Sequence, residues 1–434
     1  MPAAPADSAL YGGLFNDPET ARLFTDSAEI RAMLLVEGAL ARVQGTLGLI
    51  PPDAAAFIDR AAQEVQIDPS ALAAETARNG VPVPGLLAAF RKAAGVPEPM
   101  QYLHWGATSQ DIMDTALALR LRPMLTLWET RLTSLLQSLA TLAETHADLP
   151  MAARTYGQFA TPTSFGAVVA AWGWPLIGWR DDLPALRQKV LQVSLSGAAG
   201  TLSAMGPLGP QVRAGLADAL GLSDPGHSWH SDRSAPGHLA SFAAGLAGSL
   251  GKLGEDVLTL SQSGLSELRL AGGGSSTMPQ KQNPVGASAL VALARHVIGL
   301  SGLIHQSALH RQQRDGAAWF GEWLAVPQLC IATGRLLTLT QEITAALQPD
   351  LAAMDRLLQS DHGLIHAEAL TFALARQMPR PEAAAAVKAL CDEAQATATP
   401  LPTLASRAYP NLGWTPGDLG SAPAEVTAFA AKAR

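Results

Sequence analysis

The sequence predicts an all-α protein built around a bundle of long helices. Three observations support this prediction: apolar residues recur at helical spacing, no segment sustains the two-residue alternation of a half-buried strand, and alanine and glycine are frequent on the apolar stripes. Small side chains let helix backbones approach closely, as packing in a bundle requires. The 434 residues are 48% hydrophobic and only 15% charged, so the chain can bury a large core.

Composition divides the chain into three predicted regions. Residues 1–105 combine short helices with proline-rich joints, residues 106–350 contain the long helices, and residues 351–434 form a shorter helical region. We interpret these regions as an N-terminal domain, a central bundle domain and a C-terminal domain.

The central region holds the strongest helical patterns. Residues 111–146 predict one helix, or two separated near Pro123. The uncharged stretch 155–179 is long enough to raise the question of a membrane span, but its threonines, prolines and glycines favour a buried core helix. Residues 285–303 predict a further apolar helix. A core-facing stripe with steps of three and four residues is formed by Leu246, Leu250, Leu253, Val257 and Leu260.

Charge and cysteine content exclude several classes of function. The formal net charge of −7 excludes a generally basic nucleic-acid binder. Cys330 and Cys391 are too few for a disulfide framework or a cysteine-rich zinc site. No secretory pattern opens the sequence, so we expect a cytoplasmic protein without membrane contact. The sparse surface charge predicts large interfaces between subunits.

The polar segment 271–284 is the first candidate for chemistry. Three glycines precede two hydroxyl groups, those of Ser275 and Ser276, and then Lys281 and Asn283 before a helix that begins near Pro284. Consecutive glycines disfavour regular structure, and a glycine-rich loop can close over a substrate. A simple flexible linker is the alternative interpretation.

Residues 102–115 form the second candidate segment. Thr108 and Ser109 lie where a helix is expected to begin, so their hydroxyls and free backbone N–H groups could bind an anion, with His104 nearby. Helix capping by Thr108, Ser109 and Asp111, beside a structural histidine, is the alternative.

Two arginine-containing segments complete the set. Arg154 opens the uncharged stretch and suits a carboxylate ligand, although a surface salt bridge explains it equally well. Residues 310–315 are a basic cluster that includes Arg314, for which a solvated helix end is the alternative. His227, His230 and His238 lack a partner at metal-ligand spacing, so we expect no metal site.

Taken together, the four segments resemble the fumarase/aspartase superfamily in order and spacing. The sequence GSSTMPQKQNP at 274–284 is similar to the superfamily signature GSSxMPxKxNP. Superfamily members are helical homotetramers whose central domains form a multi-helix core, and each active site combines segments of three subunits. The resemblance therefore implies a homotetramer with shared active sites.

Within the superfamily, the chain resembles the branch of 3-carboxy-cis,cis-muconate cycloisomerases. The sequences YLHWGATSQDIMDT at 102–115 and RTYGQFATP at 154–162 are similar to its YxHxGATSQDxMDT and RTWLQHATP. The spacing of Arg314, Trp319, Glu322 and Trp323 and the segment 363–368 also fit. This branch closes a tricarboxylate, 3-carboxy-cis,cis-muconate, to carboxymuconolactone in protocatechuate catabolism by the beta-ketoadipate pathway. The resemblance implies this reaction and no cofactor.

The resemblance also implies roles for individual residues. Ser275 matches the serine that exchanges a proton with the carbon next to a carboxylate, while Lys281 and Asn283 match groups that bind a carboxylate and stabilise the enolate-like intermediate. His104 joins Ser275 and Lys281 among the predicted catalytic residues. The remaining predicted substrate contacts are Thr108, Ser109, Gln110, Arg154, Thr155, Gln158, Ser276, Met278 and Arg314.

Two residues depart from the patterns of related enzymes. Tyr156 stands where fumarase and argininosuccinate lyase have a histidine that protonates the leaving group, and Phe159 stands where cycloisomerases have histidine. A carboxylate nucleophile is ionised at neutral pH, so lactonisation needs no such acid. The loss of this histidine favours the cycloisomerase. Adenylosuccinate lyase, another superfamily lyase, a cycloisomerase for a related muconate and a catalytically silent homologue are the alternatives.

Overall fold

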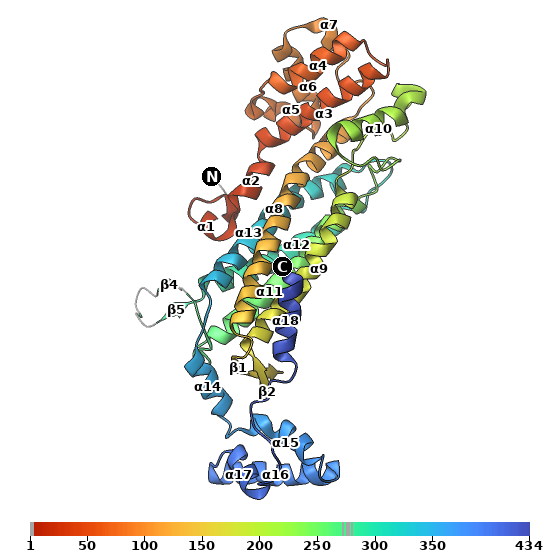
Figure 1. The fold of residues 1–434 in the computed structure, drawn as a ribbon. Helices are drawn as coiled ribbons and strands as arrows, with labels where there is room; N and C mark the ends of the chain where they lie inside the picture. Colours follow the sequence, from red (N-terminus) through yellow and green to blue (C-terminus); the bar gives the residue numbers. More distant parts are fainter. Residues whose placement is uncertain (1–3, 271–272, 275–277, 279–280) are drawn as a thin grey trace. The chain divides into compact units, whose positions relative to one another are not determined.

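The computed structural model describes residues 4–270, 273–274, 278 and 281–434 and confirms the all-α prediction (Figure 1). Long helices dominate the chain, and short strand pairs account for the little sheet that is described. The five long helices are α8 (Ser109–Thr145), α9 (Phe165–Val190), α11 (Ser234–Ser261), α12 (Val285–Gln306) and α13 (Gly316–Ala346).

Shorter helices precede, interrupt and follow these five. Those before α9 and between α9 and α11 are α1 (Gly12–Phe15), α2 (Pro18–Ala21), α3 (Asp26–Thr46), α4 (Pro52–Glu64), α5 (Ala73–Asn79), α6 (Val83–Ala94), α7 (Pro97–Met100) and α10 (Gly209–Leu220). Those after α13 are α14 (Leu351–Gln359), α15 (Ala367–Leu374), α16 (Arg380–Thr397), α17 (Leu401–Ala408) and α18 (Ala422–Ala433).

The helix predicted across residues 155–179 is only partly correct. Its first part belongs to a hairpin in which β1 (Pro150–Thr155) pairs antiparallel with β2 (Gln158–Ser164), and α9 begins only at Phe165. Threonines favour extended backbone, and Pro162 cannot donate a helical hydrogen bond, so the segment before Phe165 disfavours helix. A two-stranded hairpin has only edge strands, where proline is tolerated.

Two further local predictions are corrected. Pro123 does not divide α8, which is continuous from Ser109 to Thr145. Pro123 lies on the exposed side of the helix, where a weakened turn faces solvent and not the core. Two of the three consecutive glycines do form regular structure, because β4 (Gly273–Gly274) pairs antiparallel with β5 (Gln282–Asn283). A third strand pair joins β3 (Leu268–Arg269) to β6 (Gln348–Pro349).

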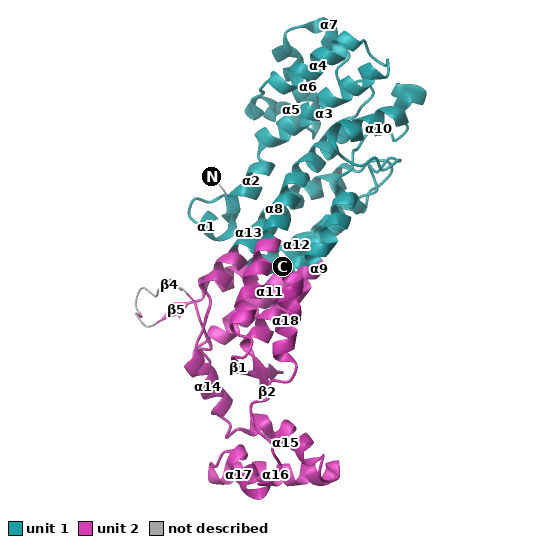
Figure 2. Ribbon diagram, viewed as in Figure 1, with its two compact units in different colours: residues 1–131, 179–248, 292–338 teal, residues 132–178, 249–291, 339–434 magenta. Residues whose placement is uncertain are grey.

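The chain divides into two compact units (Figure 2). Unit 1 comprises residues 1–131, 179–248 and 292–338, and unit 2 comprises residues 132–178, 249–291 and 339–434. Each of the five long helices supplies residues to both units. The division of the chain into three sequential domains stays a prediction.

Each unit buries its own apolar side chains. In unit 1, α3, α4 and α6 contribute Met33, Leu40, Ile58, Leu86 and Phe90 to one core. In unit 2, α15, α16 and α17 close around a smaller core that contains Leu370, Leu374, Val387, Leu401 and Leu404.

The predicted packing of α11 is confirmed. All five members of its apolar stripe are buried. Small residues allow close approach, because a Cβ atom added at Gly254 would lie 2.9 Å from a methyl group of Val291 in α12. Helix α12 is long and apolar enough to cross a bilayer, and half of its most apolar window is buried within the protein. Core helices of soluble proteins share these properties.

Candidate active site

The second candidate segment lies in unit 1, where α8 begins at Ser109 as predicted. The backbone N–H of Thr108 donates a 3.0 Å hydrogen bond to Oδ2 of Asp111, so the prediction that this N–H is free for an anion is wrong. A carboxylate three residues into a helix can reach back to a free N–H at its start, which explains the contact. The hydroxyls of Thr108 and Ser109 have no hydrogen-bond partner among the described residues and stay available to a ligand.

Asp111 joins this segment to a second loop. Its carboxylate also accepts hydrogen bonds from the backbone N–H groups of Ser196 at 2.8 Å and Gly197 at 3.0 Å, and from Nε2 of His230 at 2.7 Å. Asp111 and His230 are both buried. Four donors converge on one carboxylate, so its position is fixed before any substrate arrives.

Gln110 and Arg314 meet beside this pair. Nε of Arg314 donates to Oε1 of Gln110 at 2.7 Å, and its Nη2 lies 3.4 Å from Nδ1 of His230. Arginine can only donate, so Nδ1 is the accepting nitrogen and the hydrogen of His230 resides on Nε2, where Asp111 accepts it. Nη1 of Arg314 has no hydrogen-bond partner among the described residues, which leaves its N–H groups for a ligand.

A buried ion-pair network supports Gln110 from behind. Nε2 of Gln110 donates to Oδ2 of Asp114 at 3.2 Å. Arg233 donates to Asp114 at 2.8 Å and to Glu322 at 2.6 Å, and all three side chains are at least 96% buried. Although burial favours the neutral form, the two carboxylates raise the pKa of Arg233 above its usual value.

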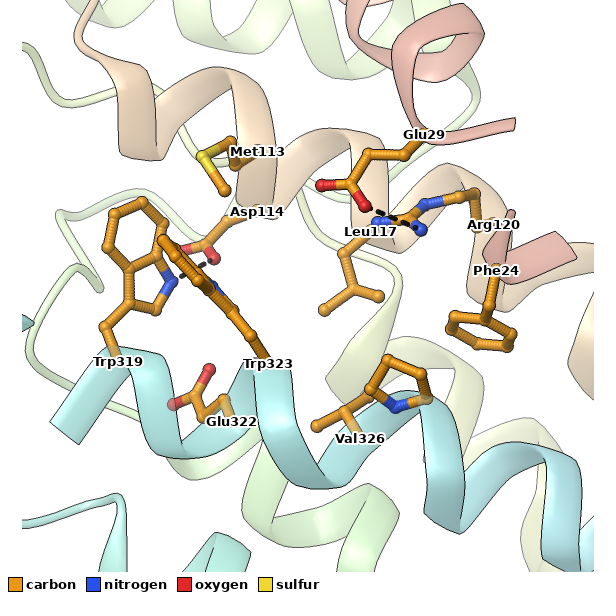
Figure 3. Close-up of a pocket in the computed structure, with 11 residues that line it drawn as sticks. Phe24, Glu29, Met113, Asp114, Leu117, Arg120, Trp319, Glu322, Trp323 and Val326 are labelled. Atoms are coloured by element: carbon orange, nitrogen blue, oxygen red, sulfur yellow. Dashed lines mark hydrogen bonds and ion pairs between the residues drawn. The ribbon is translucent and has the colours of Figure 1, made fainter. Parts of the chain in front are cut away.

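Two carboxylates of this network, Asp114 and Glu322, line a small cavity of about 90 Å³ (Figure 3). Trp319 in α13 donates from its indole N–H to Asp114 in α8 at 3.3 Å, and Trp323 packs against Trp319. These contacts give a physical reason for the spacing of Trp319, Glu322 and Trp323 in α13, which resembles the cycloisomerase pattern.

His104 lies in the turn before α8 with a left-handed backbone, at φ 65°. Its Nδ1 is 2.7 Å from Oε1 of Glu37 in α3, a residue that the sequence analysis did not single out. The side chain of His104 is mostly buried but keeps 16% of its surface exposed.

The third candidate segment belongs to unit 2, in the β1–β2 hairpin. Arg154 is an ion-pair partner of Glu267 at 2.8 Å and lies over the ring of Phe159, with 5.2 Å between the guanidinium carbon and the ring centroid. Burial raises the pKa of Glu267, and Arg154 acts in the opposite direction. Of the two interpretations given to Arg154, the geometry therefore matches an ion pair, although a largely buried one.

The tip of the same hairpin is open to solvent. Thr155 and Gln158 are exposed and pair with each other across the turn. Tyr156 and Gly157 form the turn with φ of 52° and 76°, and the Tyr156 side chain is fully exposed. Two successive residues with positive φ are typical of the tight turns that close antiparallel hairpins.

The signature segment also lies in unit 2 and is described in part. Lys281 and Met278 are exposed and Asn283 is half-buried, and the Lys281 N–H donates to the Met278 carbonyl at 3.0 Å. The predicted residues Ser275 and Ser276 lie outside the described residues. α12 begins at Val285, next to the predicted start at Pro284.

Comparison with known proteins shows the family of this chain. A family model described as Lyase matches residues 11–299. The chain is 38% identical over 400 residues to the 3-carboxy-cis,cis-muconate cycloisomerase of Pseudomonas aeruginosa, which covers 91% of this chain and 87% of that protein. The chain belongs to this lyase family. The predicted membership of the fumarase/aspartase superfamily, and with it the prediction of an enzyme, is confirmed.

Two further similarities extend along most of the chain. The crystal structure of the 3-carboxy-cis,cis-muconate lactonizing enzyme from Pseudomonas putida superposes with a TM-score of 0.91 at 33% identity, covering 98% of this chain and 99% of that one. The N-acetyl-S-(2-succino)cysteine lyase of Enterococcus italicus is 31% identical over 381 residues, or 87% of this chain and 83% of that protein.

Within unit 1 of this lyase, the structure brings together the predicted residues Gln110 and Arg314. It places His104 and Thr108 in the turn before α8 and Ser109 at the first position of α8. Unit 2 holds the predicted residues Arg154, Thr155, Gln158, Met278, Lys281 and Asn283. The sequence analysis missed four of the groups that orient them, namely Glu37, Asp114, Arg233 and Glu267. It considered His230 only as a metal ligand and Glu322 only as part of a residue spacing. A carboxylate on an apolar helical stripe, as at Glu37, is the one local signal that could have identified such a group.

Proposed function

We propose that this lyase is a cycloisomerase that closes 3-carboxy-cis,cis-muconate to carboxymuconolactone. The observation that supports this most directly is Arg314, whose guanidinium is fixed by Gln110 and His230 while Nη1 stays open to a ligand. A substrate with three carboxylates needs fixed cations, and Arg314, Lys281 and His104 are candidates. The similarity to cycloisomerases from several bacteria supports the same substrate.

The proposed reaction is an isomerisation, so no atom is lost. One carboxylate oxygen of the substrate forms a C–O bond to an alkene carbon, and the electron pair of that double bond moves to the neighbouring carbon and its carboxylate. Lys281 and Asn283 stabilise the resulting enolate-like charge, and the Ser275 hydroxyl gives its proton to the carbon. A proton from solvent water then restores the hydroxyl. Preorganised donors of this kind lower a barrier by about 2.7–4 kcal/mol each.

The departures at Tyr156 and Phe159 are compatible with this proposal. Fumarase-type elimination needs an acid for its leaving group, whereas the nucleophile here is a carboxylate that is already ionised at neutral pH. Phe159 is engaged by Arg154, so the hairpin uses it for packing.

We further propose a cytoplasmic homotetramer. Several large apolar side chains of unit 1 are exposed in the single chain, among them Ile298 and Leu303 in α12 and Phe320 and Leu324 in α13. Large apolar side chains exposed on long helices are typical of subunit interfaces. Light scattering behind size-exclusion chromatography is expected to give four times the 45.2 kDa of the chain.

The deciding experiment follows the ultraviolet absorbance of 3-carboxy-cis,cis-muconate. Ring closure removes one double bond of the conjugated diene, so the absorbance falls as the purified protein turns over. The Ser275→Ala variant is expected to abolish the fall. Turnover of adenylosuccinate or of an S-(2-succino) thioether in place of the muconate would contradict the proposal.

A further inference from the structure

Glu37 and His104 form a buried pair whose role the reaction outlined above leaves open. Glu37 is 1% exposed, and its Oε1 lies 2.7 Å from Nδ1 of His104. A carboxylate only accepts hydrogen bonds, so Nδ1 carries a hydrogen. Oε2 of Glu37 and Nε2 of His104 have no hydrogen-bond partner among the described residues. The pair therefore ends in an imidazole nitrogen that is free to meet a ligand.

Helix α3, which carries Glu37, also contacts the backbone of the turn that contains His104, where the conformation is unfavourable. A histidine at φ 65° is strained, and such strain persists only where surrounding contacts determine it. Nε2 of Gln44 donates to the carbonyl of Trp105 at 2.7 Å, which ties the turn to α3 a second time. Glu37 and Gln44 are seven residues apart, so two turns of α3 present them on one face.

Three charged groups act on His104. Glu37 comes from α3, Asp111 from α8 and Arg91 from α6. Burial and Arg91 lower the pKa of His104, but Glu37 and Asp111 outweigh them, so the pKa lies above its usual value. Removing the Glu37 charge while retaining its size is therefore the most direct perturbation of His104.

We infer that Glu37 is a positioning residue that presents His104 as an imidazolium, with its Nε2–H directed to a carboxylate of the substrate. This inference rests on the proposed function. It adds a second fixed cation to Arg314 within unit 1, which suits a substrate that carries three negative charges. The proton stays on His104 throughout, and the group acts by charge and orientation.

The test compares pH profiles of kcat/KM for wild type and Glu37→Gln. The variant is expected to shift the alkaline limb to lower pH by about one to three units, because it removes an opposite charge in direct contact with the imidazole. At a pH between the alkaline limbs of the wild type and the variant, the loss is expected in KM, with kcat within about threefold, since binding and not chemistry is weakened. Glu64→Gln, at an exposed carboxylate of α4, is the matched control and leaves the profile unchanged.

His104→Asn keeps the test decisive if Glu37→Gln fails to fold, as judged by circular dichroism. This variant has no imidazole to titrate, so its profile is expected to lose the wild-type alkaline limb. An alkaline limb that persists in His104→Asn, or one that is unmoved in folded Glu37→Gln, overturns the inference.

Histidine titration by NMR separates this inference from the proposed function. With ¹³C-labelled histidine, the signal missing from His104→Asn identifies His104 in the wild type. Its pKa is expected to be raised in the wild type and to fall in Glu37→Gln whether or not muconate is turned over. An ordinary pKa in the wild type overturns the pairing argument, whereas a raised pKa without muconate turnover contradicts only the proposed substrate.

Discussion

Nε of Arg314 donates a 2.7 Å hydrogen bond to the amide oxygen of Gln110, a residue 204 positions earlier in the chain. The amide nitrogen of Gln110 donates in turn to Asp114 and to the His230 carbonyl, so the amide cannot rotate without losing bonds. The guanidinium plane of Arg314 is therefore set before a substrate binds. Such preorganisation lowers the cost of orienting charge during the reaction.

Arg314→Lys tests this orientation. Lysine keeps the charge but loses the planar fork that contacts Gln110 and His230. We expect kcat/KM for muconate closure to fall about 100-fold, which corresponds to about 2.7 kcal/mol. Arg311→Lys, three residues earlier at a highly exposed side chain, is expected to stay within about threefold of wild type. Equal effects of the two substitutions would contradict a specific role for Arg314.

Glu322→Gln tests the network behind Gln110. Arg233 is fully buried between Glu322 and Asp114. Neutralising one of these carboxylates therefore leaves the positive charge of Arg233 only partly balanced. Breaking a buried pair in this way typically costs about 3 kcal/mol or more. We expect a loss of that size in the free energy of unfolding, measured by denaturant titration at one fixed protein concentration. Glu64→Gln serves as the exposed control, and a loss no larger than in this control would show that the network does not support the unit.

The sequence predicted features that are encoded locally. The start of α8 at Ser109 follows from capping residues, and the buried stripe from Leu246 to Leu260 follows from helical spacing. The β1–β2 hairpin was missed because Tyr156–Gly157 is an uncommon turn pair, and its flanking strands do not alternate cleanly between apolar and polar residues.

The contacts that orient the site were beyond prediction for a different reason. Glu37 and His104 are 67 residues apart, and Asp111 and His230 are 119 residues apart. No periodicity links such positions, so only tertiary packing brings them together. Resemblance to a superfamily supplied the predicted roles of Lys281 and Asn283, but not the ion pair that engages Arg154.

The lowered pKa of Asp315 predicts how the stability of the folded protein depends on pH. A hydrogen bond from Arg311 is the largest cause that holds the pKa of Asp315 well below its usual value, and backbone N–H groups at the start of α13 act in the same direction. A carboxylate with a depressed folded-state pKa adds stability above its unfolded pKa of about 3.9, and this stability is lost as pH falls through the folded value. Asp315→Asn is therefore expected to lower the melting temperature at pH 7 and to flatten its decline below about pH 4. Asp182→Asn, at an exposed position of α9, is expected to change neither the melting temperature at pH 7 nor its decline at low pH.

Tyr156→Phe tests the argument about the leaving group. The substitution removes only a hydroxyl from a fully exposed side chain at the hairpin tip, so the fold is expected to be unaffected. In lactonisation the attacking carboxylate needs no base and, in the reverse direction, no acid, so kcat is expected to stay within about threefold of wild type. Acid–base groups contribute 10²–10⁴-fold, roughly, where they act, so a loss of that size would assign proton transfer to the phenol. Tyr11→Phe, at an exposed tyrosine of unit 1, controls for loss of a surface hydroxyl.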